Sequence, residues 1–138
     1  MKQVIQNFKT GDLYVDDVPA PSISQGSVLV ENKFSLISAG TERSTVSVGK
    51  ASLIGKAKQR PDLVAQVLQN VKKEGLQATL DKVRTKLDSL KALGYSTSGV
   101  VSASMDTKGV FKVGDRVACA GQDYASHSEV VSIPQNLV

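Results

Sequence analysis

The stretch Phe-Lys-Val-Gly-Asp-Arg-Val-Ala-Cys-Ala-Gly at residues 111–121, followed by His-Ser-Glu-Val-Val-Ser-Ile-Pro at residues 127–134, carries the strongest structural signal of this chain. Gly114 and Asp115 form a turn pair, because glycine adopts positive φ angles freely and an aspartate bonds to nearby backbone. Apolar residues flank this pair on both sides. The stretch therefore predicts a strand, a tight turn, a second strand, a short loop and a third strand.

Several other short segments also have β character. Residues 3–8 and 13–18 flank Gly11 and predict a hairpin, and residues 28–38 predict one long strand. Many short strands separated by glycine and proline turns are typical of a barrel or a sandwich. The long strand is expected to place Val28, Val30, Phe34 and Leu36 on one face. Further strands are expected at residues 100–101, 110–120 and 130–133.

The middle of the chain has a helical pattern instead. Pro61 suits the first position of a helix, where its missing N–H costs nothing. Gly75 interrupts the pattern, so two helices at about 61–91 are expected to pair as a hairpin. Their apolar stripes are expected to be buried in the core, although a coiled-coil partner is an alternative. The stripe residues are Leu63, Val64, Val67, Leu68, Val71, Leu76, Leu80, Val83, Leu87 and Leu90.

Length and composition fit one domain spanning residues 1–138. The chain has 41% hydrophobic residues, and its single cysteine, Cys119, excludes an intrachain disulfide. The amino terminus has no apolar signal region, and no apolar run approaches the roughly 20 residues of a membrane span, so a cytoplasmic protein is expected. The net charge is +4, but residues 50–91 hold ten Lys/Arg and four acids, a balance of +6. Basic character therefore belongs to one segment.

Four segments in order resemble a known family: Gly-Ser-Val-Leu-Val-Glu-Asn at 26–32, Ser-Ala-Gly-Thr-Glu at 38–42, Leu-Gly-Tyr-Ser-Thr-Ser-Gly-Val-Val at 93–101, and the stretch at 111–134. Together they resemble the N-terminal, GroES-like catalytic domain of medium-chain dehydrogenase/reductases, the zinc alcohol dehydrogenases and quinone oxidoreductases. The residues of these motifs are most similar to those of bacterial bi-domain oxidoreductases. The resemblance implies a mainly β fold, a partly open GroES-like barrel, with a helical insertion at 50–92 between two motifs that flank the family's active site. That insertion could be a lid, a pocket wall or a dimer element.

The resemblance also argues against a metal. Zinc-containing relatives bind the ion through a cysteine and a histidine at positions that match Ala39 and Tyr95 here, and Ser96 replaces the adjacent glutamate. Alanine has no donor atom, and a protonated phenol is a poor zinc ligand. The four-cysteine structural lobe of zinc relatives is missing as well. No metal site is therefore expected, as in the zinc-free quinone oxidoreductases.

Three residues are candidates for catalysis. Thr41 matches the family hydroxyl that relays a proton, Tyr95 could donate a hydrogen bond to a substrate carbonyl, and Glu42 could orient the relay. Each also has a structural interpretation: a helix cap for Thr41, a half-buried tyrosine for Tyr95, and a helix-start carboxylate for Glu42. A dyad of Cys119 with His127, the only histidine, is the less favoured idea, because both match structural strand positions in relatives.

The resemblance implies that the full-length protein uses an NAD(P) cofactor. We expect that this chain alone does not bind it. No Gly-x-Gly-x-x-Gly pattern occurs among its glycines, and this pattern opens the Rossmann domain that holds a nicotinamide. We therefore expect the Rossmann domain to be absent from these residues, as in a domain fragment or a truncated product. The isolated 138-residue chain is expected to be inactive as a dehydrogenase.

Three functions are compatible with the sequence. The first is the substrate-side domain of a zinc-independent NAD(P)-dependent oxidoreductase, which acts on a small molecule; sugar chemistry is suggested by association with the bi-domain subgroup. The second is a non-catalytic binding module on a GroES-like barrel, with a homo-oligomer as a further expectation. The third, nucleic-acid binding, is disfavoured because residues 50–91 contain no aromatic residue for base stacking. No membrane partner is expected.

Overall fold

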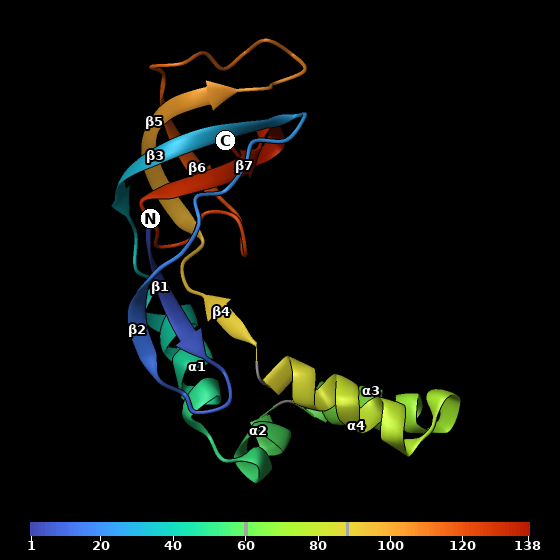
Figure 1. The fold of residues 1–138 in the computed structure, drawn as a ribbon. Helices are drawn as coiled ribbons and strands as arrows, with labels where there is room; N and C mark the ends of the chain where they lie inside the picture. Colours follow the sequence, from blue (N-terminus) through green and yellow to red (C-terminus); the bar gives the residue numbers. More distant parts are fainter. Residues whose placement is uncertain (60, 88) are drawn as a thin grey trace. The chain divides into compact units, whose positions relative to one another are not determined.

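The computed structural model describes residues 1–59, 61–87 and 89–138. The chain (Figure 1) divides into two compact units. The first unit contains Met1–Ile5, Tyr14–Glu42 and Ala92–Val138, and the second contains Gln6–Leu13 and Arg43–Lys91. The expectation of one domain over residues 1–138, with an insertion at 50–92, stays a prediction.

A four-stranded antiparallel sheet is the centre of the first unit. Its strands lie in the order β6-β5-β3-β7, and β3 pairs with β5 on one side and β7 on the other. The 3-10 helix η1 follows β7 directly. This mainly β architecture, without a closed barrel, confirms the predicted fold class. The strands are β3 (Ser27–Ser35), β5 (Ser96–Ser104), β6 (Arg116–Ala120) and β7 (Val130–Pro134), and η1 is Gln135–Leu137.

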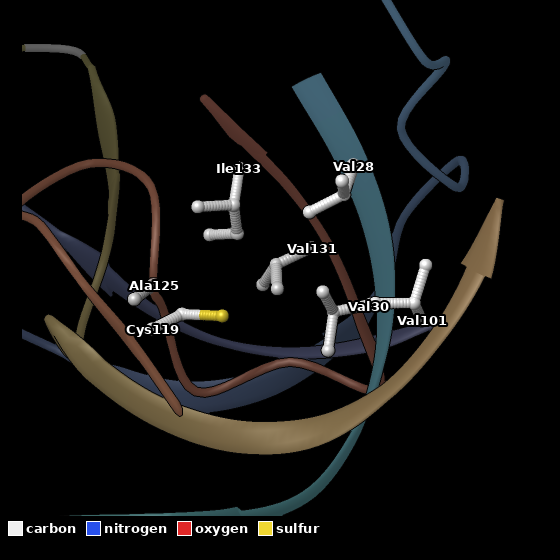
Figure 2. Packing of buried hydrophobic residues seen from close by; sticks show 7 residues of the cluster. All are labelled: Val28, Val30, Val101, Cys119, Ala125, Val131 and Ile133. Carbon is white, nitrogen blue, oxygen red and sulfur yellow. The ribbon is translucent and has the colours of Figure 1, made fainter. Parts of the chain in front are cut away.

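Small apolar side chains, all but one of them from these strands, form the core of the unit. They point toward one another in the space that the strands enclose (Figure 2). Burying a side chain of this size contributes about 1.5–3 kcal/mol relative to its exposure to water. The core therefore needs no large aromatic residue, in keeping with the low aromatic content. Its members are Val28, Val30, Val101, Cys119, Ala125, Val131 and Ile133.

Two irregularities interrupt the pairing of β3 with β5. Leu29 lies opposite Ala103 but Val30 lies opposite Val101, so that Ser102 is an extra residue of β5. Farther along, Asn32 and Phe34 lie opposite Gly99 and Ser98, so that Lys33 is an extra residue of β3. An extra residue bends a strand and disturbs the alternation of its faces.

The second irregularity corrects one sequence-based expectation. Phe34 and Leu36 were predicted to lie on the same face as Val28 and Val30, but they are 76% and 68% exposed, whereas both valines are fully buried. Because a one-residue shift moves the following side chains to the other face, the extra Lys33 accounts for the exposed Phe34. Leu36 lies beyond the end of the strand.

Three further strands, β1 (Lys2–Asn7), β2 (Leu13–Asp17) and β4 (Leu90–Ala92), form a second sheet in the order β2-β1-β4. The predicted turn between β1 and β2 is confirmed. Gly11 has a φ angle of 82°, and its N–H donates to the Asn7 carbonyl at 2.8 Å.

The predicted helical hairpin is present. The four α-helices of the described residues are α1 (Ala39–Lys50), α2 (Leu53–Gln59), α3 (Pro61–Glu74) and α4 (Leu76–Leu87). α3 begins at Pro61, and Gly75, with a φ angle of 88°, separates it from α4. α3 and α4 lie side by side (Figure 1). Within the described residues, no helix combines the length and hydropathy needed to cross a membrane.

The details of the hairpin differ from the prediction in two ways. α4 ends at Leu87, and Leu90 begins strand β4 instead of extending the helix. The apolar stripe is also not buried: Leu68 is 60% exposed, Leu76 is 62% exposed, and α3, all of whose side chains are described, contains no buried residue. The expectation of a fully buried stripe is therefore wrong for the described side chains, because two helices that pair with each other cover only the seam between them.

The segment before Gly114 is a loop rather than the strand expected to begin at residue 110. The Asp106 carboxylate accepts hydrogen bonds from the backbone N–H groups of Lys108 at 2.8 Å, Val110 at 2.5 Å and Phe111 at 3.1 Å. Backbone donors held in this way do not join a ladder of strand hydrogen bonds. The turn itself forms as predicted, with Gly114 at a φ angle of 96°.

Candidate functional site

The start of α1 is fixed by a reciprocal pair of hydrogen bonds. The Glu42 N–H donates to the Ser38 carbonyl at 3.0 Å, and the Ser38 N–H donates to Glu42 Oε1, also at 3.0 Å. A carboxylate that reaches back to the residue before a helix satisfies a backbone donor that would otherwise lack a partner. It also places negative charge at the positive end of the helix dipole. One oxygen of Glu42 is therefore committed to the fold.

The second oxygen of Glu42 binds His127. Glu42 Oε2 lies 2.9 Å from His127 Nε2, and the two side chains are only 12% and 10% exposed. Because an ionised carboxylate only accepts hydrogen bonds, Nε2 carries the hydrogen in this pair. A hydrogen bond to a charged acceptor in a water-poor setting is stronger than one between neutral groups. The pair joins residues that are 85 positions apart in the sequence.

The backbone of His127 is also fixed by hydrogen bonds. Its N–H donates to the Leu93 carbonyl at 2.7 Å, and its carbonyl accepts from Val4 N at 2.9 Å. Gly94 lies against it: a β-carbon on Gly94 would lie 2.6 Å from His127 N and 2.9 Å from the ring atoms Cγ and Nδ1. Only glycine fits there, since its φ angle of 98° also disfavours other residues. The glycine of the Leu-Gly-Tyr motif thus makes room for the histidine.

The three predicted catalytic residues have different surroundings. Glu42 is at the centre of the arrangement just described, Thr41 precedes it on α1 with an exposed side chain, and Tyr95 is half-buried beside Gly94. The Tyr95 carbonyl accepts from Gly121 N at 2.9 Å. In the described part of the chain, the Tyr95 hydroxyl makes no hydrogen bond to Glu42. The catalytic roles of all three stay predictions.

His127 is the residue that the sequence analysis did not place in the site. The sequence analysis disfavoured a dyad of His127 with Cys119, and Cys119 is 2% exposed and belongs to the core (Figure 2). Burial raises the pKa of the Cys119 thiol, so the thiolate is disfavoured. His127 Nε2 binds Glu42 instead, and Nδ1 has no hydrogen-bond partner among the described residues. The available signal was that His127 is the only histidine of the chain.

A pocket of about 310 Å³ lies beside His127 in the first unit. Residues from the start of β1, the end of β3 and the segment 127–129 line it, together with Val15 of β2. Neither Thr41 nor Tyr95 is among its lining residues. His127 therefore links the start of α1 to a pocket that the sequence analysis did not predict.

The donor set suits neither a zinc ion nor a dinucleotide. Within residues 1–59, 61–87 and 89–138, no group of three His, Cys, Asp or Glu side chains is arranged to hold a metal ion. Ala39, at the first turn of α1, has no ligating atom. The Rossmann site for a dinucleotide is built on parallel strands, whereas the four-stranded sheet is antiparallel at each of its pairings. These residues therefore do not fit either group.

The comparisons with known proteins rest on structure. No family model and no curated protein matches the sequence. Solved structures that are similar include a probable oxidoreductase from Mycobacterium abscessus (TM-score 0.60, 19% identity, 99% of this chain and 33% of that chain). A quinone oxidoreductase from Coxiella burnetii has a TM-score of 0.60 at 16% identity over 99% of this chain and 35% of that one. A mycobacterial protein in complex with NADPH has a TM-score of 0.56 at 16% identity, over 99% of this chain and 31% of that one.

These likenesses define the fold. Each covers nearly all of this chain, and this chain spans about one third of the length of each of those proteins. At identities below 20% they carry no residue-level assignment. The chain has the fold of about one third of an oxidoreductase structure such as these.

Proposed function

We propose that this chain is the substrate-side domain of a zinc-independent NAD(P)-dependent oxidoreductase. The observation that carries the proposal is the contact of segments 38–42 and 93–95 with His127. In the family that the sequence resembles, these two motifs flank the active site. Here Glu42 binds the imidazole and Gly94 makes room for it, so the two motifs are held around one buried side chain.

The proposed roles follow from this arrangement. Thr41 lies next to Glu42 on the first turn of α1, and its hydroxyl, which can donate and accept at once, would relay a proton. Tyr95 would donate a hydrogen bond to a substrate carbonyl. Glu42 would be a positioning residue that orients the proton relay. One of its carboxylate oxygens accepts from the Ser38 N–H and the other binds His127, so neither oxygen is free to take part in the reaction.

The cofactor would be bound outside these 138 residues. One of the similar structures holds NADPH, and each of those proteins is about three times as long as this chain. A nicotinamide would supply the hydride. The chain would shape the other side of the reaction, for a small substrate in the cytoplasm that we expect to be related to sugars. The lack of a donor atom at Ala39 supports catalysis without zinc.

The first experiment compares NAD(P)H oxidation by the 138-residue chain with that by the natural polypeptide that carries it with a cofactor-binding domain. Only the latter should turn over, with quinones and aldehydes as probe substrates. Turnover by the isolated chain would contradict the proposal. The proposal would also be contradicted if the reading frame encodes, near these residues, no strand that is followed by a Gly-x-Gly-x-x-Gly pattern and a helix.

The role of Thr41 is tested in the active polypeptide. Thr41→Val should lower kcat by about 10²–10⁴-fold, the range for loss of general acid–base catalysis, and Thr41→Ser should restore most of it. Ser44→Ala is the matched control, because Ser44 is an exposed hydroxyl on the same helix. Equal kcat values for Thr41→Val and Ser44→Ala would show that the Thr41 hydroxyl has no catalytic role.

Zinc independence has a separate readout. The purified active polypeptide should contain much less than one zinc per chain, and prolonged dialysis against a chelator should leave its kcat unchanged. One equivalent of zinc whose removal abolishes turnover would overturn the zinc-independent part of the proposal while leaving the oxidoreductase part in place.

A further inference from the structure

The first turn of α1, which carries Thr41, is weakly held by its own residues. Gly40 precedes Thr41 in this turn, and glycine is a poor helix former because its unfolded backbone has the most freedom to lose. A β-carbon on Gly40 would meet nothing within 4 Å, so packing does not hold the turn at that position. The backbone of this turn therefore depends on anchors at other residues.

Glu42 provides such an anchor through its carboxylate. Oε1 accepts from the Ser38 N–H at 3.0 Å, which ties the side chain to the residue before the helix. A glutamate side chain has several torsions, and holding it in one orientation costs conformational entropy. A second contact, at Oε2, removes much of the remaining freedom and keeps Oε1 directed at Ser38.

His127 makes that second contact from a rigid support. Its Nε2 lies 2.9 Å from Glu42 Oε2, and its side chain is only 10% exposed. Its backbone N–H donates to the Leu93 carbonyl, and its carbonyl accepts from the Val4 N–H. The ring lies against Gly94. The imidazole is therefore a fixed donor to which the carboxylate is held.

The surroundings of the ring select the form that can donate. A hydrogen on Nε2 is accepted by Glu42 Oε2. Nδ1 is buried and has no hydrogen-bond partner among the described residues. A neutral ring with its hydrogen on Nδ1 would leave that hydrogen without an acceptor and would turn the lone pair of Nε2 toward the carboxylate. We therefore assign the hydrogen of the neutral ring to Nε2.

We propose that His127 is a positioning residue for the proton relay of Thr41, a role that rests on the proposed function of this chain. The Nε2 hydrogen of His127 fixes Glu42, Glu42 fixes the start of α1, and the first turn of α1 holds the Thr41 hydroxyl in place. His127 itself transfers no proton in this role. A side chain that donates from the same place should therefore replace it, and a shorter one should not.

Two amide substitutions form a matched pair. His127→Gln carries an N–H to the place of Nε2, whereas His127→Asn carries the same group one methylene closer to the backbone and cannot reach Glu42. In the 138-residue chain, NMR should find hydrogen exchange at the Ser38 and Glu42 amides about tenfold faster in His127→Asn than in His127→Gln. The reason is the loss of a hydrogen bond to a charged group. Equal exchange rates would overturn the proposal, and this measurement requires no turnover.

The active polypeptide provides the kinetic test. His127→Asn should lower kcat by up to about 10²-fold with little change in KM, because a displacement of about 1 Å can cost that much. His127→Gln should retain most of the activity. Added to Thr41→Val, His127→Asn should cause little further loss, since residues that act as a unit are not additive.

The failure of this inference is distinguishable from failure of the relay. If Thr41→Val lowers kcat but His127→Asn and His127→Gln have equal kcat values, or if the losses of Thr41→Val and His127→Asn are additive, the role of His127 is refuted and the relay stands. If Thr41→Val has no effect, the relay itself is refuted, and the role of His127 is refuted with it.

Val131→Ala is the control for a general loss of stability. Val131 is 3% exposed and belongs to the core of the first unit, so its truncation should destabilise the fold but leave kcat unchanged at temperatures where the protein is folded. A loss of kcat as large as that of His127→Asn would contradict a positional role. If His127→Asn does not fold, His127→Gln decides, and a kcat as low as that of Thr41→Val would refute the proposal.

Discussion

Gly94 is the single residue on which the arrangement at His127 depends most directly. A β-carbon there would approach His127 N to 2.6 Å, whereas Gly109, which also has a positive φ angle (67°), has nothing within 4 Å of the same position. Gly109→Ala should therefore destabilise the protein by about 1–2 kcal/mol through backbone strain alone. Gly94→Ala should cost about 1–3 kcal/mol more, because His127 must also move.

Urea denaturation of the two glycine variants measures the difference. Equal losses of unfolding free energy would mean that Gly94 and His127 are not packed as tightly as described. A displaced His127 should also be visible in the imidazole resonances of Gly94→Ala, and Gly109→Ala should leave those resonances unchanged.

Cys119 should be chemically inert in the native protein. Its side chain is 2% exposed, and burial raises the pKa of its thiol, so both access and thiolate formation are suppressed. A thiol reagent such as Ellman's reagent should label less than a tenth of the protein under native conditions at pH 8, and one equivalent after denaturation. Rapid native labelling would place Cys119 outside the core.

Some of these residue roles could be predicted from the sequence and others could not. The glycines at turns, such as Gly11 and Gly114, are visible in local patterns because a turn requires only neighbouring residues. The partnership of Glu42 with His127 spans 85 positions, and no local pattern specifies it. The resemblance identified Glu42 as a site residue but assigned His127 to a strand. The contact of His127 with Glu42 is therefore visible only in the structure.

Among the secondary-structure elements, the loop that begins at Asp106 has a measurable pH dependence. Backbone hydrogen bonds, first that of Lys108 and then those of Phe111 and Val110, hold the pKa of the Asp106 carboxyl below its ordinary value of 3.8. A carboxyl whose pKa is lower in the folded state stabilises the fold above its unfolded pKa. That contribution is lost as the pH falls through the folded pKa.

Asp106→Asn should therefore lower the unfolding free energy at pH 7, and the difference from the parent protein should shrink below about pH 4. The measurement is a series of denaturant titrations between pH 3 and pH 7. Asp16→Asn is the control, because among the described residues the Asp16 carboxylate accepts from a single backbone N–H, that of the next residue. A difference that is constant across this pH range would contradict the capping role of the Asp106 charge.

The elements also show where sequence patterns lose their reliability. Pro61 and Gly75 mark the bounds of α3 correctly, since both act through local backbone geometry. The spacing of Leu76, Leu80, Val83 and Leu87 correctly predicted α4, but it could not reveal how much of the stripe another element covers. Residues 110–113 were expected to be a strand, and the hydrogen bonds of the Asp106 carboxylate to the backbone of Val110 and Phe111 overrode that preference.

At the scale of the whole molecule, the two units should differ in local stability. The described core cluster lies entirely in β3, β5, β6, β7 and Ala125, and no side chain of α3, as described, is buried. Amides protected by a buried core open only in global unfolding, while those of exposed helices open locally. Native-state hydrogen exchange should therefore find the slowest amides in β3 and β5 and faster ones in α3 and α4.

The exchange experiment has a clear opposite outcome. If the amides of α3 and α4 are as protected as those of Val30 and Val101, the helical hairpin is held by contacts beyond those between its two helices. The leucine stripe of the hairpin would then be covered, as its sequence pattern predicts. Measurement across a range of protein concentrations would distinguish a contact within one chain from a contact between two copies.

The paired irregularities of β3 and β5 have a consequence for how this fold tolerates change. Ser102 is one residue too many on one strand and Lys33 is one too many on the other, and the register before the first irregularity is the same as the register after the second. The two extra residues offset each other in the register of the pair. Removing Lys33 alone would leave every pair with its present partner but would turn Phe34 to the opposite face of β3, whereas removing both extra residues should yield a plain ladder with both ends in place.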